Sequence, residues 1–269
     1  MSMIAGFIAT LLYLGASLML ALRLRRKVAH EPQPPARWPV LAVWALAVLL
    51  HGATIYGDAF SPSGIDMGFF NALSLSAWLI ALLLWIASLR HPLELLGIIL
   101  LPFAALALAL ELSLGGTGTA TALPAGLQIH ILTSLLAYSL LAIAAIQAIL
   151  LAIQNKHLHN HHPRGFIRAL PPLAMMESLL FQIIGLGFVF LSASLASGFL
   201  FLEDLFAQQV AHKTVLSIAA WLLFGTLLFG RWRFGWRGRI AIRWTLGGFG
   251  ALVLAYFGSK LVLELVLGR

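Results

Sequence analysis

The stretch from Leu127 to Ile153, LQIHILTSLLAYSLLAIAAIQAILLAI, contains no Asp, Glu, Lys or Arg. In water it would expose far too much apolar surface. As an α-helix it is long enough to cross the hydrocarbon core of a bilayer, which is about 30 Å thick. Similar apolar runs, separated by short basic or Gly/Pro-bearing breaks, fill the rest of the chain. The sequence therefore predicts an all-α fold, a polytopic transmembrane helical bundle.

The composition supports this fold class. Apolar residues make up 61% of the chain and charged residues 10%, against about 25% charged residues in a soluble domain. The absence of cysteine excludes disulfides, iron–sulfur clusters and thiolate metal sites. We expect a single membrane domain over residues 1–269 with about eight spans: Ile4–Ala21, Pro39–Tyr56, Gly68–Leu89, Leu95–Leu112, Leu127–Ile153, Leu179–Leu202, Thr214–Phe229 and Trp244–Leu267. The first is expected to be a retained helix, because its basic residues follow the apolar run instead of preceding it.

The basic residues predict the orientation of the bundle. Fourteen of the 17 Lys and Arg residues fall in the breaks after spans one, three, five and seven, and three fall on the opposite side. The positive-inside rule places the fourteen in the cytoplasm and both termini outside. The net charge of +8 is then explained by topology and by contact with anionic lipid headgroups, so membrane lipids are expected partners. Nucleic acid is not an expected partner, since the sequence predicts no folded basic surface with elements that could contact the bases.

Six of the nine histidines lie on the predicted cytoplasmic side. His30 and His91 are expected to be solvated. The tract from His157 to His162, HLHNHH, can bind transition metals in principle, but it has no carboxylate or thiolate nearby and is interpreted as a solvated loop.

The other three histidines, His51, His130 and His212, lie on the predicted outer side of spans two, five and seven. Neutral imidazole is a good ligand for haem iron, and two imidazoles on opposed helices could bracket a porphyrin. The alternative is that each ring hydrogen-bonds a carbonyl or caps a helix. Both readings stay open from the residues alone.

Other polar and small residues are assigned structural roles. Glu94 and Glu177 sit at the cytoplasmic starts of spans four and six, where the helix dipole favours an anion. Trp232 and Trp236 are expected at the headgroup level, tolerant of substitution. The glycines of spans six and eight allow close helix packing. No phosphate loop, nucleophile elbow or His-Glu-x-x-His motif is present, and no catalytic residue is predicted.

Four stretches of spans five to eight, over about residues 127–267, carry a family resemblance. They are His130–Ser139 (HILTSLLAYS), Ile184–Phe188 (IGLGF) leading to Ala196–Gly198 (ASG), His212–Trp221 (HKTVLSIAAW), and Gly235–Arg239 (GWRGR) followed by Ala255–Gly258 (AYFG). Together they resemble the cytochrome c assembly (CcsA/ResC/HemX-type) membrane protein family, most closely its small inner-membrane, YpjD-like branch. Spans one to four, about residues 4–112, resemble it only loosely.

The resemblance implies a multi-pass protein of a bacterial-type inner membrane that binds or passes haem near the outer face. His130 matches an outer axial histidine of the family, and His212 falls where larger members end a tryptophan-rich segment. Two departures argue against full cytochrome c synthase activity. Phe201–Ala211 contains no tryptophan, and the chain ends without a second outer histidine.

The leading hypothesis is a haem-handling or cytochrome-assembly accessory protein. Its predicted ligands are His130 with His212 or His51, and its expected partners are haem and other cytochrome-assembly or membrane proteins. The alternatives are a small-solute or ion transporter, and a non-haem scaffold or regulatory subunit of a membrane complex.

Overall fold

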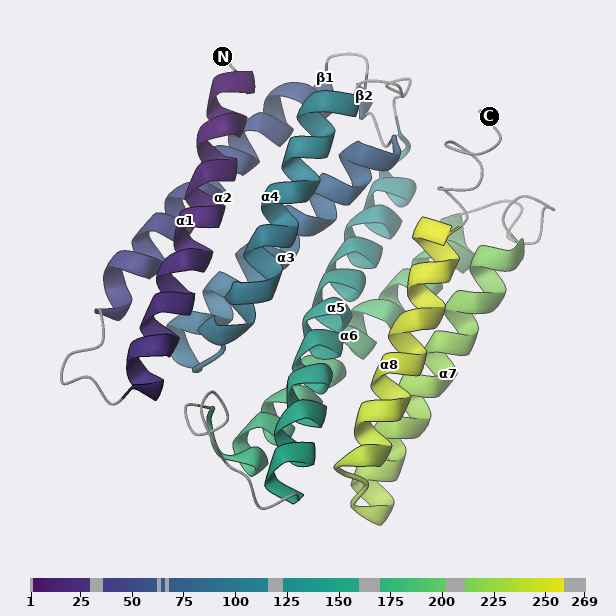
Figure 1. The fold of residues 1–269 in the computed structure, drawn as a ribbon. Coiled ribbons are helices and arrows are strands. Elements are labelled where there is room, and N and C mark those ends of the chain that lie inside the picture. The colour runs from purple at the N-terminus through teal and green to yellow at the C-terminus, as the bar shows by residue number, and fades with distance from the viewer. Residues whose placement is uncertain are drawn as a thin grey trace. The chain divides into compact units, whose positions relative to one another are not determined.

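The computed structural model describes residues 2–29, 36–61, 64–65, 68–115, 123–159, 170–201 and 211–258. Their secondary structure is almost entirely helical, which confirms the predicted fold class (Figure 1). The α-helices are α1 (Ser2–Val28), α2 (Arg37–Ala59), α3 (Phe69–Arg90), α4 (Gly97–Leu114), α5 (Ala125–His159), α6 (Leu173–Phe201), α7 (Ala211–Phe234) and α8 (Arg239–Val253). A 3₁₀ turn (Glu94–Leu96) precedes α4, a π-helical turn (Leu254–Gly258) continues α8, and two-residue strands β1 (Phe60–Ser61) and β2 (Gly64–Ile65) pair antiparallel.

Within these described residues, eight helical segments are long and apolar enough to cross a membrane. The predicted number of spans is therefore confirmed. Three sets of residues named in the predictions lie outside the described part of the chain: His30, residues 160–162 of the histidine tract, and the segments 202–210 and 259–269, which include the predicted end of span eight.

Several helices extend beyond the apolar runs that predicted them. The helix α1 continues to Val28 through four basic residues, and α7 continues past Phe229 through Arg231 and Arg233. Arg and Lys are good helix formers, and their long side chains carry the charge away from the helix axis toward water. Charge therefore marks where a helix leaves the hydrocarbon region, and not where the helix ends.

The chain divides into two compact units. The first contains α1–α4 and the second contains α5–α8. In the first unit α1 packs against α2 and α4, and α3 packs against the same two helices; in the second, α5 packs against α6 and α8, and α7 against the same two. Each unit is thus a ring of four alternating helices, as in an up-and-down bundle. The single domain over residues 1–269 stays a prediction.

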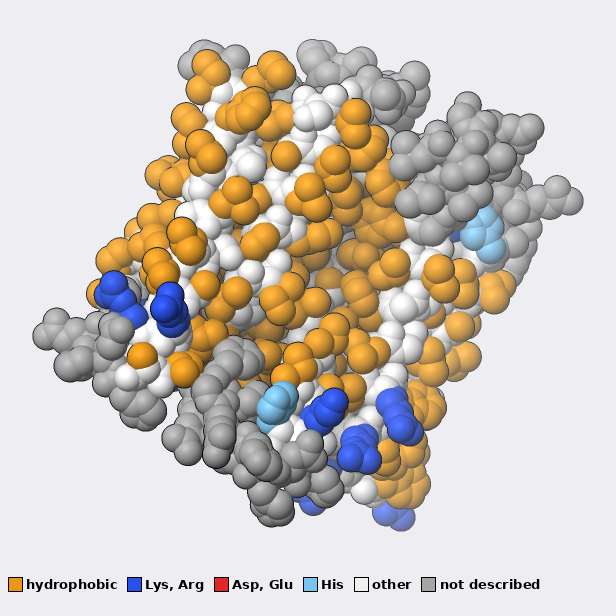
Figure 2. All heavy atoms as spheres, viewed as in Figure 1, with side chains coloured by type: hydrophobic (Ala, Val, Ile, Leu, Met, Phe, Trp, Pro, Cys, Tyr) orange, Lys and Arg blue, Asp and Glu red, His pale blue; other side chains and the backbone are white. Residues whose placement is uncertain are grey.

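The side chains of both units are arranged as expected in lipid. On α1 the large residues Phe7, Leu11 and Leu18 are at least 60% exposed, whereas Ala9 and Ala16 are fully buried. Small residues inside let helices approach closely, and large apolar residues outside face the acyl chains. On the face in Figure 2, hydrophobic side chains cover the middle of the helices of each unit, and most of the visible Lys and Arg lie at one end of each unit.

Arg37 fastens the basic end of the first unit. It begins α2, and its guanidinium donates to the carbonyl oxygens of Ser88 in the last turn of α3 and of His91 just after it, and to Oε2 of Glu94 at 3.3 Å. Carbonyl groups at a helix C-terminus lack partners within the helix, so a cation there is favourable. Glu94 therefore binds an arginine in addition to lying at the start of a helix.

The predicted orientation is testable with fusions. A fluorescent protein that folds only in the cytoplasm, fused to the C-terminus, should stay dark, because both termini are expected outside. The same reporter inserted after Lys156 should fluoresce. A bright C-terminal fusion with a dark internal one would reverse the orientation.

In the connection between α7 and α8, the ring of Trp236 packs against both helices. Gly235 and Gly238 have φ angles of 67° and 59°, a backbone region that glycine enters without steric penalty. The Trp236 ring lies over Gly230, where an added Cβ would come within 2.3 Å of it. Its ring centroid lies 5.6 Å from that of Trp244 on α8. The Trp236 side chain is therefore half-buried and packs between α7 and α8, whereas the Trp232 side chain is 81% exposed.

The two tryptophans should respond differently to replacement by leucine. Trp232→Leu removes only an exposed contact and should change the free energy of unfolding by less than about 0.5 kcal/mol. Trp236→Leu removes ring contacts to both helices and should destabilise by about 1–2 kcal/mol. Thermal unfolding in detergent compares the two; equal effects would show that Trp236, like Trp232, lies at the headgroup level, as the sequence alone predicted.

Candidate functional site

His130 is fixed by α6 at the end of the second unit where α5 begins. Its Nδ1 lies 2.9 Å from the carbonyl oxygen of Ser194 and 3.3 Å from the hydroxyl of Ser197. Because a carbonyl only accepts hydrogen bonds, Nδ1 carries the proton, and in neutral imidazole Nε2 then keeps its lone pair. No hydrogen bond to Nε2 is formed within the described part of the chain.

Serine hydroxyls hold the backbone around this ring. Ser134 donates to the carbonyl oxygen of His130 at 2.6 Å, and its oxygen lies 2.6 Å from the hydroxyl of Ser194. Ser197 in turn donates to the Ser194 carbonyl oxygen at 2.9 Å. The result is one polar network across the contact between α5 and α6. Since both hydroxyls of α6 are buried, the network restricts the orientation of the imidazole.

The helices approach closely beside this network. Gly126 lies one turn before His130, and a Cβ added there would come within 2.5 Å of the Phe201 ring. On α6, Gly198 next to Ser197 is buried. Further along α6, Phe199, Leu200 and Phe201 are each more than half exposed. An imidazole with one free nitrogen therefore lies beside an apolar end of α6.

His212 is the second residue of α7 and is exposed. Both α5 and α7 begin at the same end of the second unit (Figure 1), so His212 lies at the same end as His130. No contact between the two side chains is observed. His212 is free to bind a ligand in a way that a buried ring is not.

His51 lies in the first unit and is fully buried. Its Nδ1 is 3.2 Å from the hydroxyl of Tyr13, and its Nε2 is 2.9 Å from the hydroxyl of Ser74. One ring nitrogen donates and the other accepts, so both positions of a neutral imidazole are used. This arrangement fits a structural histidine that links α1, α2 and α3.

A conservative substitution tests that role. Tyr13→Phe removes one partner of the buried imidazole and should lower the stability of the protein by about 1–2 kcal/mol. Ser113→Ala is the control, because that hydroxyl is exposed and donates to the Ala109 carbonyl of its own helix. Haem content should stay unchanged in both variants. Loss of haem in the tyrosine variant would implicate His51 in ligand binding.

The serine partners were not assigned from the sequence. Ser134, Ser194 and Ser197 occur in otherwise apolar spans, and the spacing of four between His130 and Ser134 puts them on one helix face. Polar residues on one face of a membrane helix indicate an interhelical contact. The spacing of residues could not predict that the backbone carbonyl of Ser194 accepts from Nδ1 and so fixes the tautomer of His130.

Comparison with known proteins identifies the family to which the sequence is similar. The sequence model of the cytochrome C assembly protein family matches residues 40–267. The inner membrane protein YpjD of Escherichia coli K12 is 35% identical over 229 residues, which cover 84% of this chain and 85% of YpjD. A 28.8 kDa protein of Azospirillum brasilense is 35% identical over 144 residues, 53% of either chain.

The cytochrome c biogenesis protein CcsA of Chlamydomonas reinhardtii is 27% identical over 140 residues, 51% of this chain and 38% of CcsA. No solved structure matches. The family match begins in α2, so it extends beyond the second unit, to which the sequence resemblance had largely been confined. With 40–267 matched, the chain belongs to the cytochrome c assembly family of membrane proteins.

Proposed function

We propose that this protein binds haem at the end of the second unit that carries His130 and passes it on during cytochrome c assembly at the outer face of a bacterial inner membrane. The observation that carries the proposal is the His130 ring, whose Nδ1–H is held by the Ser194 carbonyl while Nε2 keeps its lone pair. Histidines that ligate metals almost always have the other ring nitrogen fixed in this way.

The residues present fit one axial ligand of haem. His130 supplies neutral imidazole, and Phe199, Leu200 and Phe201 offer exposed apolar surface at the same end of α6. For the second ligand the geometry favours His212, which is exposed, over His51, whose two nitrogens are both hydrogen-bonded. Bound haem would supply a redox-active iron, and this chain would hold and orient it through the imidazoles of His130 and His212.

The relatives support the same role. One of them is named a cytochrome c biogenesis protein and another an inner membrane protein. We propose other cytochrome-assembly proteins as the partners that deliver or receive the haem. We assign no catalytic residue to the chain itself.

Spectroscopy on the purified protein tests the proposal. Protein expressed with ample haem supply should show a Soret band, and a pyridine haemochrome assay should give a defined haem-to-protein ratio. If no haem is retained and added haem binds no better than to detergent micelles alone, the proposal fails and a scaffold role gains support.

A further inference from the structure

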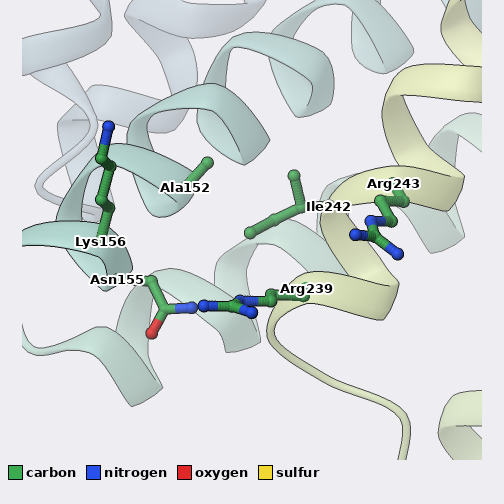
Figure 3. Close-up of a pocket in the computed structure, with 6 residues that line it drawn as sticks. All are labelled: Ala152, Asn155, Lys156, Arg239, Ile242 and Arg243. Carbon is green, nitrogen blue, oxygen red and sulfur yellow. The ribbon is translucent and has the colours of Figure 1, made fainter. Parts of the chain in front are cut away.

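A basic pocket lies between α5 and α8 at the end of the second unit opposite to His130. Its volume is about 440 Å³, and it is lined by Ala152, Asn155 and Lys156 of α5 and by Arg239, Ile242 and Arg243 of α8 (Figure 3). Arg239 extends from α8 toward Asn155. Three of the six lining residues are cationic, and none is acidic.

The positive charge of this pocket is not neutralised within the described residues. Lys156, Arg239 and Arg243 form no ion pair there. Glu177 on α6 instead accepts the backbone N–H of Gly238 at 2.8 Å. That carboxylate lies at the N-terminus of α8, where it compensates the helix dipole, and among the described residues it forms no ion pair with the three cations. The pocket therefore favours an anion.

An apolar strip runs from the pocket toward the middle of α5. Ile149 and Ile153 are each 40% exposed, and they lie on the helix face that carries Ala152 and Lys156, at spacings of three and four residues. A free inorganic anion has no apolar part that could contact this strip. A phospholipid would place its phosphate among the cations and its acyl chains along the isoleucines.

We propose that the pocket binds an anionic phospholipid by its headgroup phosphate, and that a headgroup with two phosphodiesters, as in cardiolipin, is preferred over one with a single phosphate. The three cations of the pocket neutralise the two negative charges of such a headgroup, whereas a lipid with a single phosphate would leave two of them without an anion. Basic pockets between membrane helices on the cytoplasmic side are suited to such headgroups.

Lipid-dependent stabilisation of the full chain tests this site. A lipid that binds only the folded protein raises its unfolding temperature in proportion to the logarithm of its concentration. Cardiolipin added in detergent should stabilise the wild type more than phosphatidylglycerol at equal charge, and phosphatidylcholine should have little effect. The triple variant K156Q/R239Q/R243Q should need about a hundredfold more cardiolipin for the same stabilisation.

The control variant R25Q/R26Q/K27Q removes the same charge from the exposed end of α1 and should respond like the wild type. Equal responses of both triple variants would overturn the site. Full stabilisation by inorganic phosphate alone would assign the pocket to a free anion and also overturn it. If the first variant does not fold, the single variants K156Q and R243Q are compared with R25Q, and native mass spectrometry counts the retained cardiolipin. Retention equal to that of R25Q would contradict the proposal.

Discussion

His130→Ala should remove haem from the purified protein, with at least a hundredfold loss of affinity, because an iron ligand is lost outright whereas loss of an outer partner of a ligand costs about 10–100-fold. His130→Asn is the sharper variant. Its side-chain amide nitrogen is attached to Cγ as Nδ1 is and can still donate to the Ser194 carbonyl, so the contact between α5 and α6 is retained while the imidazole is absent. Absorption spectra after expression with ample haem, and haem titration of the purified protein, measure the effect.

The controls separate ligation from folding. His157→Ala changes a histidine at the other end of α5, where Nδ1 donates to the Ile153 carbonyl of its own helix, and it should leave the spectrum unchanged. His212→Ala should weaken binding and shift the iron toward high spin, as expected when one of two imidazoles is lost. Added imidazole should restore the spectrum of His130→Ala. An unchanged Soret band in His130→Asn would refute the assignment of this ligand.

Gly187→Leu should be among the most destabilising single changes in the second unit. A Cβ at Gly187 would lie 2.8 Å from a terminal carbon of Leu141 and 3.4 Å from the Cβ of Leu140, both on α5. A leucine would force α5 and α6 apart along the contact that also carries the His130 network. Overpacking of this kind costs about 1–3 kcal/mol.

Gly185 provides the matched control for that substitution. It lies two residues away on the same helix, and nothing is within 4 Å of an added Cβ. Gly185→Leu should therefore be tolerated, and thermal unfolding in detergent compares the two variants. Similar melting temperatures would show that α5 and α6 do not pack closely at Gly187. Haem content should fall with Gly187→Leu only.

These glycines also show what the sequence could and could not predict. The glycines of spans six and eight all suggest close packing. Gly187, and on α8 Gly248 against Phe224, approach a neighbour, whereas an added Cβ at Gly185, Gly247 or Gly250 would meet nothing within 4 Å. The apolar runs predicted eight spans because length and hydropathy depend on residues close together in the chain. Which face of each helix meets which neighbour depends on residues distant in sequence.

The candidate site, too, could be predicted from the sequence only in part. His130 could be selected as a candidate because an imidazole in an apolar span needs a partner, and the resemblance indicated its role. The difference between His130 and His51 could not be predicted. Both are single histidines near the predicted outer ends of apolar helices, and only the packed helices show one ring with a free nitrogen and the other hydrogen-bonded by Tyr13 and Ser74.

The length of α5 ties the two ends of the second unit together. The helix has 35 residues, and a rise of about 1.5 Å per residue separates His130 from Lys156 by about 39 Å. That span is close to the thickness of a bilayer with its headgroups, about 40–45 Å. One uninterrupted helix thus sets the depth of the imidazole and of the basic pocket at once. Deleting a single residue from its middle would rotate one end against the other by about 100° and misalign one of the two, with the composition of the helix hardly changed.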